Sequence, residues 1–329
     1  MTEGADIKRI YAFFNGSAKS SLPELCLALL AQQKTAWPQL RDGYAGLMSL
    51  KERIIREGDF TVALQCNPQR IKSTGADVNP DSIKARPCFL CGENRPEVQQ
   101  AILYRRKFLV LCNPWPIFPW HFTISHIEHI AQSLIRALPA FLQLAKDFHP
   151  GFALLYNGPE CGASAPDHLH FQAVPKAAIP ILKDQFDAGK KPLRKAGGVF
   201  LFKTESGERS AMIVEGEDKK ELVAFLRRIF RAMKNVLHLS DEPMMNLFCL
   251  YEKGKWRVVI FPRLKHRPEA YYQSGDDRIL VSPGAVEMGG VLVLPREQDF
   301  YRLEAAAIRK LFREVSLPEE KLEEIVAVI

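Results

Sequence analysis

Residues 157–175 read NGPECGASAPDHLHFQAVP, and this segment determines how the rest of the chain is interpreted. It opens with turn residues, continues through small residues, and ends in alternating polar and apolar side chains. Alternation with a period of two is typical of a half-buried strand, so His168, His170 and Gln172 are expected on one face of that strand. Two imidazoles and an amide are costly to bury without partners. The pattern therefore indicates a functional site.

The groups on this face suit nucleophilic attack on phosphorus. A neutral imidazole is a good nucleophile near pH 7. Small residues and the Ser164 hydroxyl in the preceding loop let backbone N–H groups approach an anion. Gln172 can donate a hydrogen bond to a phosphoryl oxygen but cannot protonate a departing alkoxide. A phosphate-like leaving group and an acceptor other than water are therefore favoured. Two inert, hydrogen-bonded core histidines are the alternative that the motif leaves open.

The run HLHFQ, preceded by GAS and NG, resembles the active-site segment of one branch of the histidine-triad superfamily. That branch holds the galactose-1-phosphate uridylyltransferases and the diadenosine tetraphosphate phosphorylases. The resemblance implies that His170 forms a covalent nucleotidyl intermediate and that Gln172 and Ser164 stabilise phosphoryl oxygens. It also implies that Asn157 and Gly162 in the loop contact the substrate.

One residue of this segment departs from the family pattern. Asp167 stands between the usual proline and the first histidine, so the path of the loop is expected to differ slightly.

A second motif, Cys88-x-x-Cys91, is followed by a glycine. Two thiolates at this spacing can chelate one metal ion through a tight turn. A redox pair is the alternative, but the bulky residues between the cysteines argue against it. By resemblance to zinc-bearing uridylyltransferases, the remaining ligands are His168 and a histidine after the preceding strand, which is His129 or, as a less favoured substitute, His126. Four protein ligands leave no open position, so the implied zinc is structural.

Residues 106–130 predict a strand over FLVLC, a proline-rich turn, a second strand and the start of a helix. FLVLC is apolar throughout, as in a strand buried on both faces. The turn NPWPIFPWHF resembles the first strand pair of the superfamily, most closely in its phosphorylase branch, and implies that Asn113 binds substrate. Trp115, Phe118 and Trp120 can form the walls of a base pocket or an ordinary hydrophobic corner.

Residues 1–59 predict a helical N-terminal extension, with Ser21 as a helix N-cap, a break at Trp37-Pro38 and a second helical pattern over 44–58. Residues 60–66 then predict a strand. The polar stretch after it contains Arg70, which a loose likeness to an Asn/Asp-Pro-x-Arg stretch of uridylyltransferases places at substrate phosphate. An exposed loop cation is the alternative.

Residues 196–329 predict a strand pair, a helix, a hairpin, a strand and a final helix over 299–315. This order repeats that of residues 60–185 without the histidine face, which indicates a second, non-catalytic half. A charged linker over 182–198 separates the two. Arg263 lies in the densest cationic cluster of the chain and can bind an acceptor phosphate, or belong to an exposed basic loop.

Together these patterns predict an α+β protein. Its expected architecture is two histidine-triad-like halves, each with an antiparallel sheet and packed helices, plus the helical extension.

Composition limits the classes of partner. The chain of 329 residues has a net charge of +7, and its basic residues are scattered, which argues against nucleic acid. A small phosphate-bearing ligand or a solvated basic surface explains the excess of positive charge. No apolar run has the length of a membrane helix and no signal-peptide pattern is present, so the cytoplasm is the expected location. The 7 dispersed cysteines do not form a disulfide framework.

The expected function is that of a nucleotidyltransferase or nucleotide phosphorylase. It would act on a nucleoside diphosphate sugar or a dinucleoside polyphosphate, with inorganic phosphate or a sugar phosphate as the acceptor. A hydrolase of the same superfamily and a non-catalytic nucleotide-binding protein are the alternatives. Whether the two halves pair within one chain or across a homodimer stays open.

Overall fold

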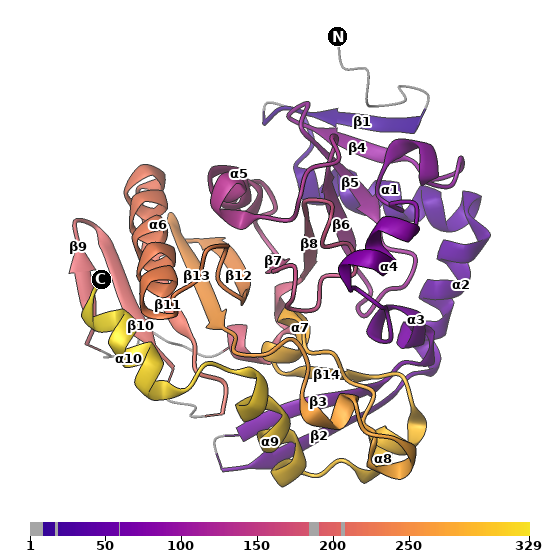
Figure 1. Ribbon diagram of the computed structural model, residues 1–329. Helices are drawn as coiled ribbons and strands as arrows, with labels where there is room; N and C mark the ends of the chain where they lie inside the picture. Colours follow the sequence, from indigo (N-terminus) through magenta and orange to yellow (C-terminus); the bar gives the residue numbers. More distant parts are fainter. Residues whose placement is uncertain (1–8, 17–18, 59, 184–190, 205–207) are drawn as a thin grey trace.

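The structure, a computed structural model, describes residues 9–16, 19–58, 60–183, 191–204 and 208–329. Its centre is an 11-stranded sheet with the order β1-β4-β5-β6-β8-β7-β12-β13-β11-β10-β9 (Figure 1). A 3-stranded sheet, β14-β3-β2, lies beside it, with α7 between the two sheets in Figure 1. The predicted end of the first half at residue 185 and residues 184–190 of the predicted linker lie outside the described residues.

The first group of elements in the large sheet follows the predicted pattern. It comprises β4 (Ala101–Tyr104), β5 (Phe108–Cys112), β6 (Phe122–His126), α5 (Leu134–Asp147), β7 (Phe152–Asn157) and β8 (His170–Pro175). The strands are antiparallel and lie in the order β5-β6-β8-β7, so β8 is a central strand. The histidine segment is therefore held by a neighbour on each side.

The second group has the same connectivity. It comprises β9 (Arg194–Ala196), β10 (Val199–Lys203), β11 (Met212–Gly216), α6 (Lys219–Val236), β12 (Met245–Glu252) and β13 (Lys255–Pro262). Its strand order β10-β11-β13-β12 corresponds to β5-β6-β8-β7. The two predicted sheets are joined, because β7 pairs with β12. Both strands are mainly buried, so a free edge at either one would leave buried backbone N–H and C=O groups without hydrogen-bond partners. The halves thus pair within one chain.

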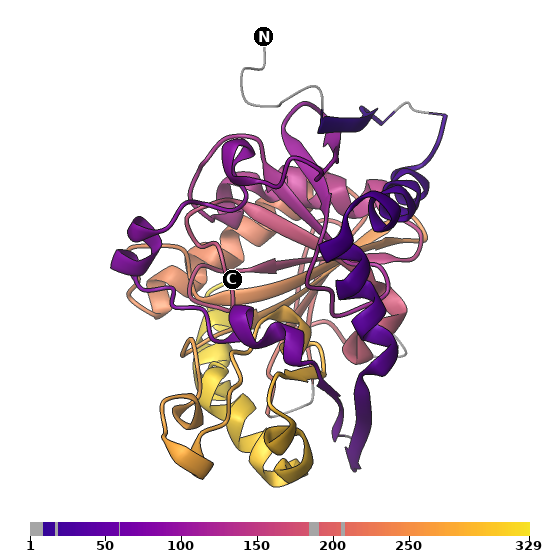
Figure 2. The same cartoon turned by 90° about the vertical axis from the view of Figure 1, so that its right-hand side faces the viewer.

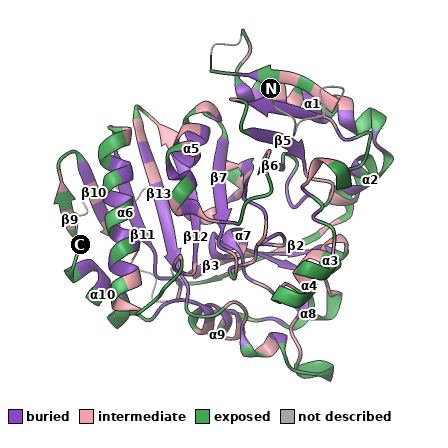
Figure 3. Cartoon of the chain, turned by 45° about the horizontal axis from the view of Figure 1, so that its top comes forward, coloured by how far each residue is buried: buried purple, intermediate pink, exposed green. Residues whose placement is uncertain are grey.

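The two faces of the large sheet differ: α5 and α6 pack on one face, called the helical side, and His170 and Gln172 lie on the other, called the site side. Leu169, Phe171 and Ala173 point to the core that includes residues of α5 and α6, and the indole of Trp256 donates to the Leu142 carbonyl of α5 at 2.8 Å. Figure 3 shows α6 exposed on its outer side and the strands beneath it buried. Since side chains alternate along a strand, His170 and Gln172 face the opposite side.

The N-terminal region is only partly helical. Ser21 and Glu24 form a reciprocal capping box at the start of α1 (Leu22–Ala36), and Trp37 separates it from α2 (Pro38–Gly46), as predicted. Figure 2 shows both helices, in indigo, along the side of the large sheet. The predicted helix over 44–58 is wrong beyond its first residues, because residues 51–57 form a strand.

That strand, β2 (Lys51–Glu57), pairs with β3 (Phe60–Cys66) in antiparallel register. Cross-strand pairing with β3 outweighs the local helical spacing. A further strand, β1 (Ile10–Phe14), pairs with β4. The third strand of the small sheet is β14 (Val291–Leu294), which pairs with β3 in parallel. A strand from the C-terminal region is therefore hydrogen-bonded to the strand that precedes Arg70.

The remaining helices are short. They are α3 (Ile71–Thr74), α4 (Pro80–Ala85), α7 (Ala285–Met288), α8 (Glu297–Arg302), α9 (Ala305–Val315) and α10 (Glu319–Ala327). The predicted helix over 299–315 is therefore divided in two, with an extended residue, Leu303, after α8. In the part of the chain that the structure describes, no helix is both long and apolar enough to traverse a bilayer.

Candidate active site and metal centre

A cavity of about 610 Å³ opens over the site side of β8. Its volume is that of a small-molecule binding site. It is bounded by the turn after β5, the segment with α3, the segment around Phe89 and the loop before β8. The residues that line it include Trp37, Arg70, Lys72, Arg86, Phe89, Asn113, Trp115, Ser164, His170 and Gln172.

His170 is held in one orientation. Its Nδ1–H donates to the carbonyl of His168 at 2.8 Å. The Gln132 side chain accepts from the His170 backbone N–H at 2.8 Å and donates to its carbonyl at 3.1 Å. Burial lowers the pKa of His170 to about 4, so the ring is neutral near pH 7. Since Nδ1 is engaged, Nε2 is the ring nitrogen that remains for the cavity.

Gln172 is oriented by His121. The backbone N–H of Ile117 donates to His121 Nδ1 at 3.1 Å, which places the ring proton on Nε2. His121 Nε2 then donates to Gln172 Oε1 at 2.6 Å, so the amide NH₂ of Gln172 is left as a donor. Burial lowers the pKa of His121 to about 4 and keeps this tautomer neutral.

The positioning role of His121 was missed at the sequence level. The residue lies in the quoted NPWPIFPWHF run, but its partner depends on the pairing of Thr123 with Gln172 across β6 and β8. Gln132 was missed for the same reason, because it precedes α5 and reaches β8 only in the folded chain.

The loop before β8 requires a glycine at position 162. Gly162 has φ +88°, and a Cβ there would lie 2.8 Å from the Cα of Gly284. We expect Gly162→Ala to lower the free energy of unfolding by about 2–3 kcal/mol, from backbone strain plus this backbone contact. Urea denaturation measures this change. Gly151→Ala is the matched control, because Gly151 has φ +97° and a Cβ added there would meet no atom within 4 Å. An equal loss in both variants would contradict the role of the close approach.

Four of the five substrate-binding residues that the sequence predicted line one of two neighbouring pockets. Arg70 and Asn113 line the cavity with His170, Gln172 and Ser164. Arg70 donates to the Trp115 carbonyl at 2.9 Å. Asn157 and Gly162 line a smaller polar pocket of about 50 Å³, which Arg70, Ser164 and Gln172 also border.

Arg263 lies outside both pockets, in a structural position. Its side chain is buried, and all five N–H donors are used. They donate to the carbonyls of Val315, Pro283, Lys265 and His266 and to the side chain of Asn246. Asn246 in turn donates to Asn157 Oδ1 at 2.8 Å and to the Cys161 carbonyl at 2.7 Å. Arg263 therefore supports the loop instead of offering donors to a ligand.

Of the three aromatic residues predicted as possible walls of a base pocket, one lines the cavity. Trp115 lines the cavity. Phe118 is buried in the core beside the small sheet, and Trp120 packs on Phe152 with ring centroids 5.8 Å apart. The hydrophobic-corner alternative thus describes Phe118 and Trp120.

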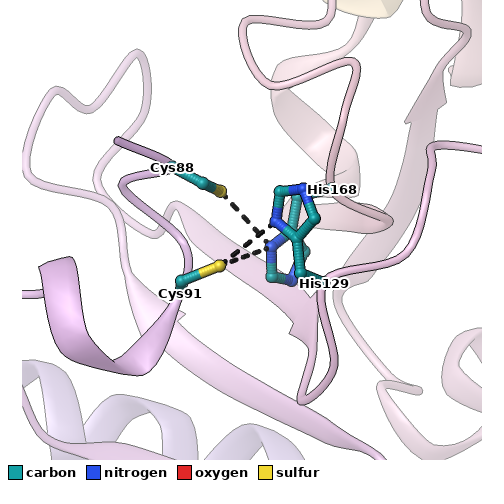
Figure 4. Close-up of side chains that lie close together, drawn as sticks. All are labelled: Cys88, Cys91, His129 and His168. Atoms are coloured by element: carbon teal, nitrogen blue, oxygen red, sulfur yellow. Dashed lines mark hydrogen bonds between the residues drawn. The ribbon is translucent and has the colours of Figure 1, made fainter. Parts of the chain in front are cut away.

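Cys88, Cys91, His129 and His168 come together in space, as Figure 4 shows. Phe89 and Leu90, between the two cysteines, line the cavity. The ligand atoms of the four residues all lie within 4.8 Å of one another. His168 Nδ1 is 3.4 Å from Cys88 Sγ, and His129 Nδ1 is 3.2 Å from Cys91 Sγ. Tetrahedral Zn–S and Zn–N bonds place sulfur and nitrogen roughly 3.5 Å apart. The cluster can therefore bind a metal ion, and its donor set and spacing suit zinc.

Neighbouring groups fix the orientation of these ligands. His168 Nε2–H donates to the His126 carbonyl at 2.8 Å, so Nδ1 faces the cluster. His126 contributes this carbonyl and is not itself in the cluster. The Cys91 N–H donates to the Cys88 carbonyl at 3.2 Å, and Asn94 donates to the same carbonyl at 2.9 Å, which closes the turn. The residues of this cluster thus lie between the cavity wall around Phe89 and the start of β8.

Comparisons with known proteins match both parts of the chain. Residues 29–175 match a family model described as a domain of unknown function, DUF4922, and residues 208–329 match one described as GDPGP1-like, C-terminal domain. No curated protein sequence matches this chain.

Solved structures of a yeast enzyme match nearly the whole chain. Yeast Ap4A phosphorylase Apa2 is 15% identical, with a TM-score of 0.53 over 85% of this chain and 94% of that chain. Its complex with Ap4A is 14% identical, with a TM-score of 0.51 over 86% of this chain and 97% of that chain. Its complex with AMP is 12% identical, with a TM-score of 0.52 over 86% and 98%. The chain therefore has the fold of yeast Ap4A phosphorylase Apa2.

Proposed function

We propose that the protein is a nucleotidyltransferase in which His170 is the nucleophile. The substrate is a nucleoside diphosphate sugar or a dinucleoside polyphosphate. The observation that carries the proposal is the state of His170: it is neutral and lines a cavity of nucleotide size, and its Nδ1–H is fixed on the His168 carbonyl. A histidine with only a packing role would not need to present Nε2 to a cavity.

In the first step, the lone pair of His170 Nε2 attacks the α-phosphorus of the substrate. A P–N bond forms and the bond from phosphorus to the bridging oxygen breaks. The leaving group departs as a sugar phosphate or a nucleoside polyphosphate, which needs no proton from the enzyme at neutral pH. The imidazole gains a positive charge, which the carbonyl of His168 stabilises through Nδ1–H.

The oxygens on phosphorus gain charge in this step and need donors. The NH₂ group of Gln172 is directed by His121 and is available to them. The Ser164 hydroxyl and the Arg70 guanidinium line the same cavity. Such preorganised donors stabilise the transition state more than the ground state.

In the second step, an oxygen of the acceptor attacks the same phosphorus, the P–N bond breaks, and the imidazole returns to its neutral form. The proposed acceptor is inorganic phosphate, with a sugar phosphate as the alternative. The likeness to a phosphorylase over most of both chains supports phosphate. The lining residues Arg70, Lys72 and Arg86 supply positive charge for an anionic acceptor.

We further propose that the metal is zinc and that its role is structural. The four residues would fill all four positions of a tetrahedral ion, so no substrate oxygen would need to reach it. Zinc on His168 would fix the start of β8, two residues before His170.

Mass spectrometry of the intact protein tests the proposal. Wild-type protein is incubated, without acid, with a panel of nucleoside diphosphate sugars and dinucleoside polyphosphates in the absence of phosphate. We expect a mass gain of one nucleoside monophosphate, which also identifies the base. Adding phosphate should discharge the label as the nucleoside diphosphate. Binding of panel compounds without any label would favour a non-catalytic nucleotide-binding protein.

His121→Asn tests the orientation of the Gln172 amide. Asparagine is too short to reach Gln172, so the amide can rotate away from the phosphoryl oxygens. We expect kcat to fall by a factor on the order of 10–100, because one oriented donor is lost. Single-turnover kinetics measures the effect on the first step. If His121→Asn and wild type form the intermediate at the same rate, His121 does not position Gln172 for catalysis.

A further inference from the structure

Asp167 is the residue that departs from the family pattern, and it lies between the metal cluster and the cavity wall. Its side chain is 19% exposed. Oδ2 lies 3.7 Å from His129 Nε2, and Oδ1 lies 3.7 Å from Arg86 Nη2. Oδ1 is buried and has no hydrogen-bond partner. A partly buried carboxylate is costly unless a nearby group donates a hydrogen bond to it or compensates its charge.

His129 is the group that can donate a hydrogen bond to this carboxylate. Its Nδ1 faces Cys91 Sγ at 3.2 Å, so Nδ1 is the metal-binding atom and the ring proton is on Nε2. Nε2 lies 3.7 Å from Asp167 Oδ2, about 0.5 Å beyond an ordinary hydrogen bond. A metal ion on Nδ1 withdraws charge from the imidazole and makes Nε2–H a stronger donor.

Arg86 holds the carboxylate on its other side. Its Nη2 donates to the Ser164 carbonyl at 2.8 Å, and its guanidinium lies 5.2 Å from the centroid of the Phe89 ring. These contacts fix a positive charge beside Asp167. The carboxylate is therefore compensated and kept at the edge of the metal cluster.

We infer that Asp167 is a positioning residue for the metal ligand His129. It accepts a hydrogen bond from His129 Nε2–H, sets the tautomer that presents Nδ1 to the metal, and raises the basicity of that nitrogen. The inference depends on the metal centre and does not depend on the proposed transferase activity.

The affinity for Zn²⁺ tests this inference. Metal-free protein is titrated with Zn²⁺ in competition with a chromogenic chelator at one fixed pH. Asp167→Asn is expected to weaken Zn²⁺ binding by about 10–100-fold, because the nearly isosteric amide accepts a weaker hydrogen bond. Asp167→Glu, which keeps the charge, should recover part of the loss.

Glu93→Gln is the matched control. Glu93 is an exposed acid in the same turn, and its charge also acts on Cys91. Loss of the Glu93 charge should change the affinity for Zn²⁺ by no more than about twofold. Equal affinities of Asp167→Asn and wild type would overturn the inference, as would an equal loss in Glu93→Gln, because the effect would then be one of net charge alone. Failure of the wild type to bind Zn²⁺ would overturn the metal centre as well.

A measurement on the wild type gives a test that needs no variant. In zinc-loaded protein, the His129 Nε2 proton should exchange slowly with water and give a downfield NMR signal, although the ring itself is about half exposed. A proton exchanging too fast to observe would overturn the hydrogen bond, whatever the folding of the variants.

Discussion

His170→Gln is expected to abolish nucleotidyl transfer, with kcat lowered by a factor on the order of 10⁴ or more. Glutamine fills a similar volume but has no nucleophilic lone pair, so neither step of the double displacement can occur. The mass label should disappear completely, while binding of the substrate persists. Steady-state turnover and intact mass measure the two effects.

The variant should remain folded. The backbone of residue 170 keeps its two hydrogen bonds to Gln132, and the histidine side chain contributes a single hydrogen bond, to the His168 carbonyl. His238→Asn is the control, because His238 is exposed and has φ 53°, a conformation that asparagine tolerates. Turnover by His170→Gln within tenfold of the wild type would mean that another group is the nucleophile, or that water attacks directly.

Cys88→Ser is expected to remove the metal and to destabilise the fold by several kcal/mol, since metal-binding free energy is folding free energy for such a site. The four candidate ligands come from three separate segments of the chain, around residues 88–91, 129 and 168. Apart from the ion, the turn at residues 88–91 meets the loop before β8 through a small buried cluster, Cys88, Leu90 and Ala165, so the ion would add a strong link at this point.

Elemental analysis should give one zinc per chain for the wild type and none for Cys88→Ser. The midpoint temperature of thermal unfolding should be lower in the variant and in wild type treated with a chelator. Added Zn²⁺ should restore this temperature in the wild type alone. Cys66→Ala is the control, because Cys66 lies in β3 and outside the cluster. A wild type whose unfolding is insensitive to the chelator would contradict a structural metal.

Much of the site could be predicted because local sequence determines it. The alternation of residues 168–173 places His170 and Gln172 on one face wherever the strand lies in the sheet. The capping box of Ser21 and Glu24 and the turn at Cys88 and Cys91 are closed by residues three apart in the chain. The metal set also came from the resemblance, and the structure brings its four members together.

Other positions could not be predicted, because their partners are distant in the chain. Arg263 has the charge of a phosphate ligand, but carbonyls and the Asn246 side chain, which lie up to 52 residues away in the second half, accept from all its donors in the folded chain. Residues 51–57 have helical spacing, yet β3 offers them a cross-strand partner. His121 becomes a positioning residue through a strand register that no local pattern contains.

Local sequence patterns are therefore enough to predict which groups are available: a histidine face on a strand, a chelating turn and the elements of an α+β fold. These depend on alternation, turn chemistry and helix capping, which act over a few residues. The folded chain was needed to show which nitrogen of His170 is left for the cavity, that Arg263 is structural, and that Asp167 lies beside His129. Those outcomes depend on hydrogen bonds between distant segments, whose donors and acceptors must be satisfied together once water is excluded.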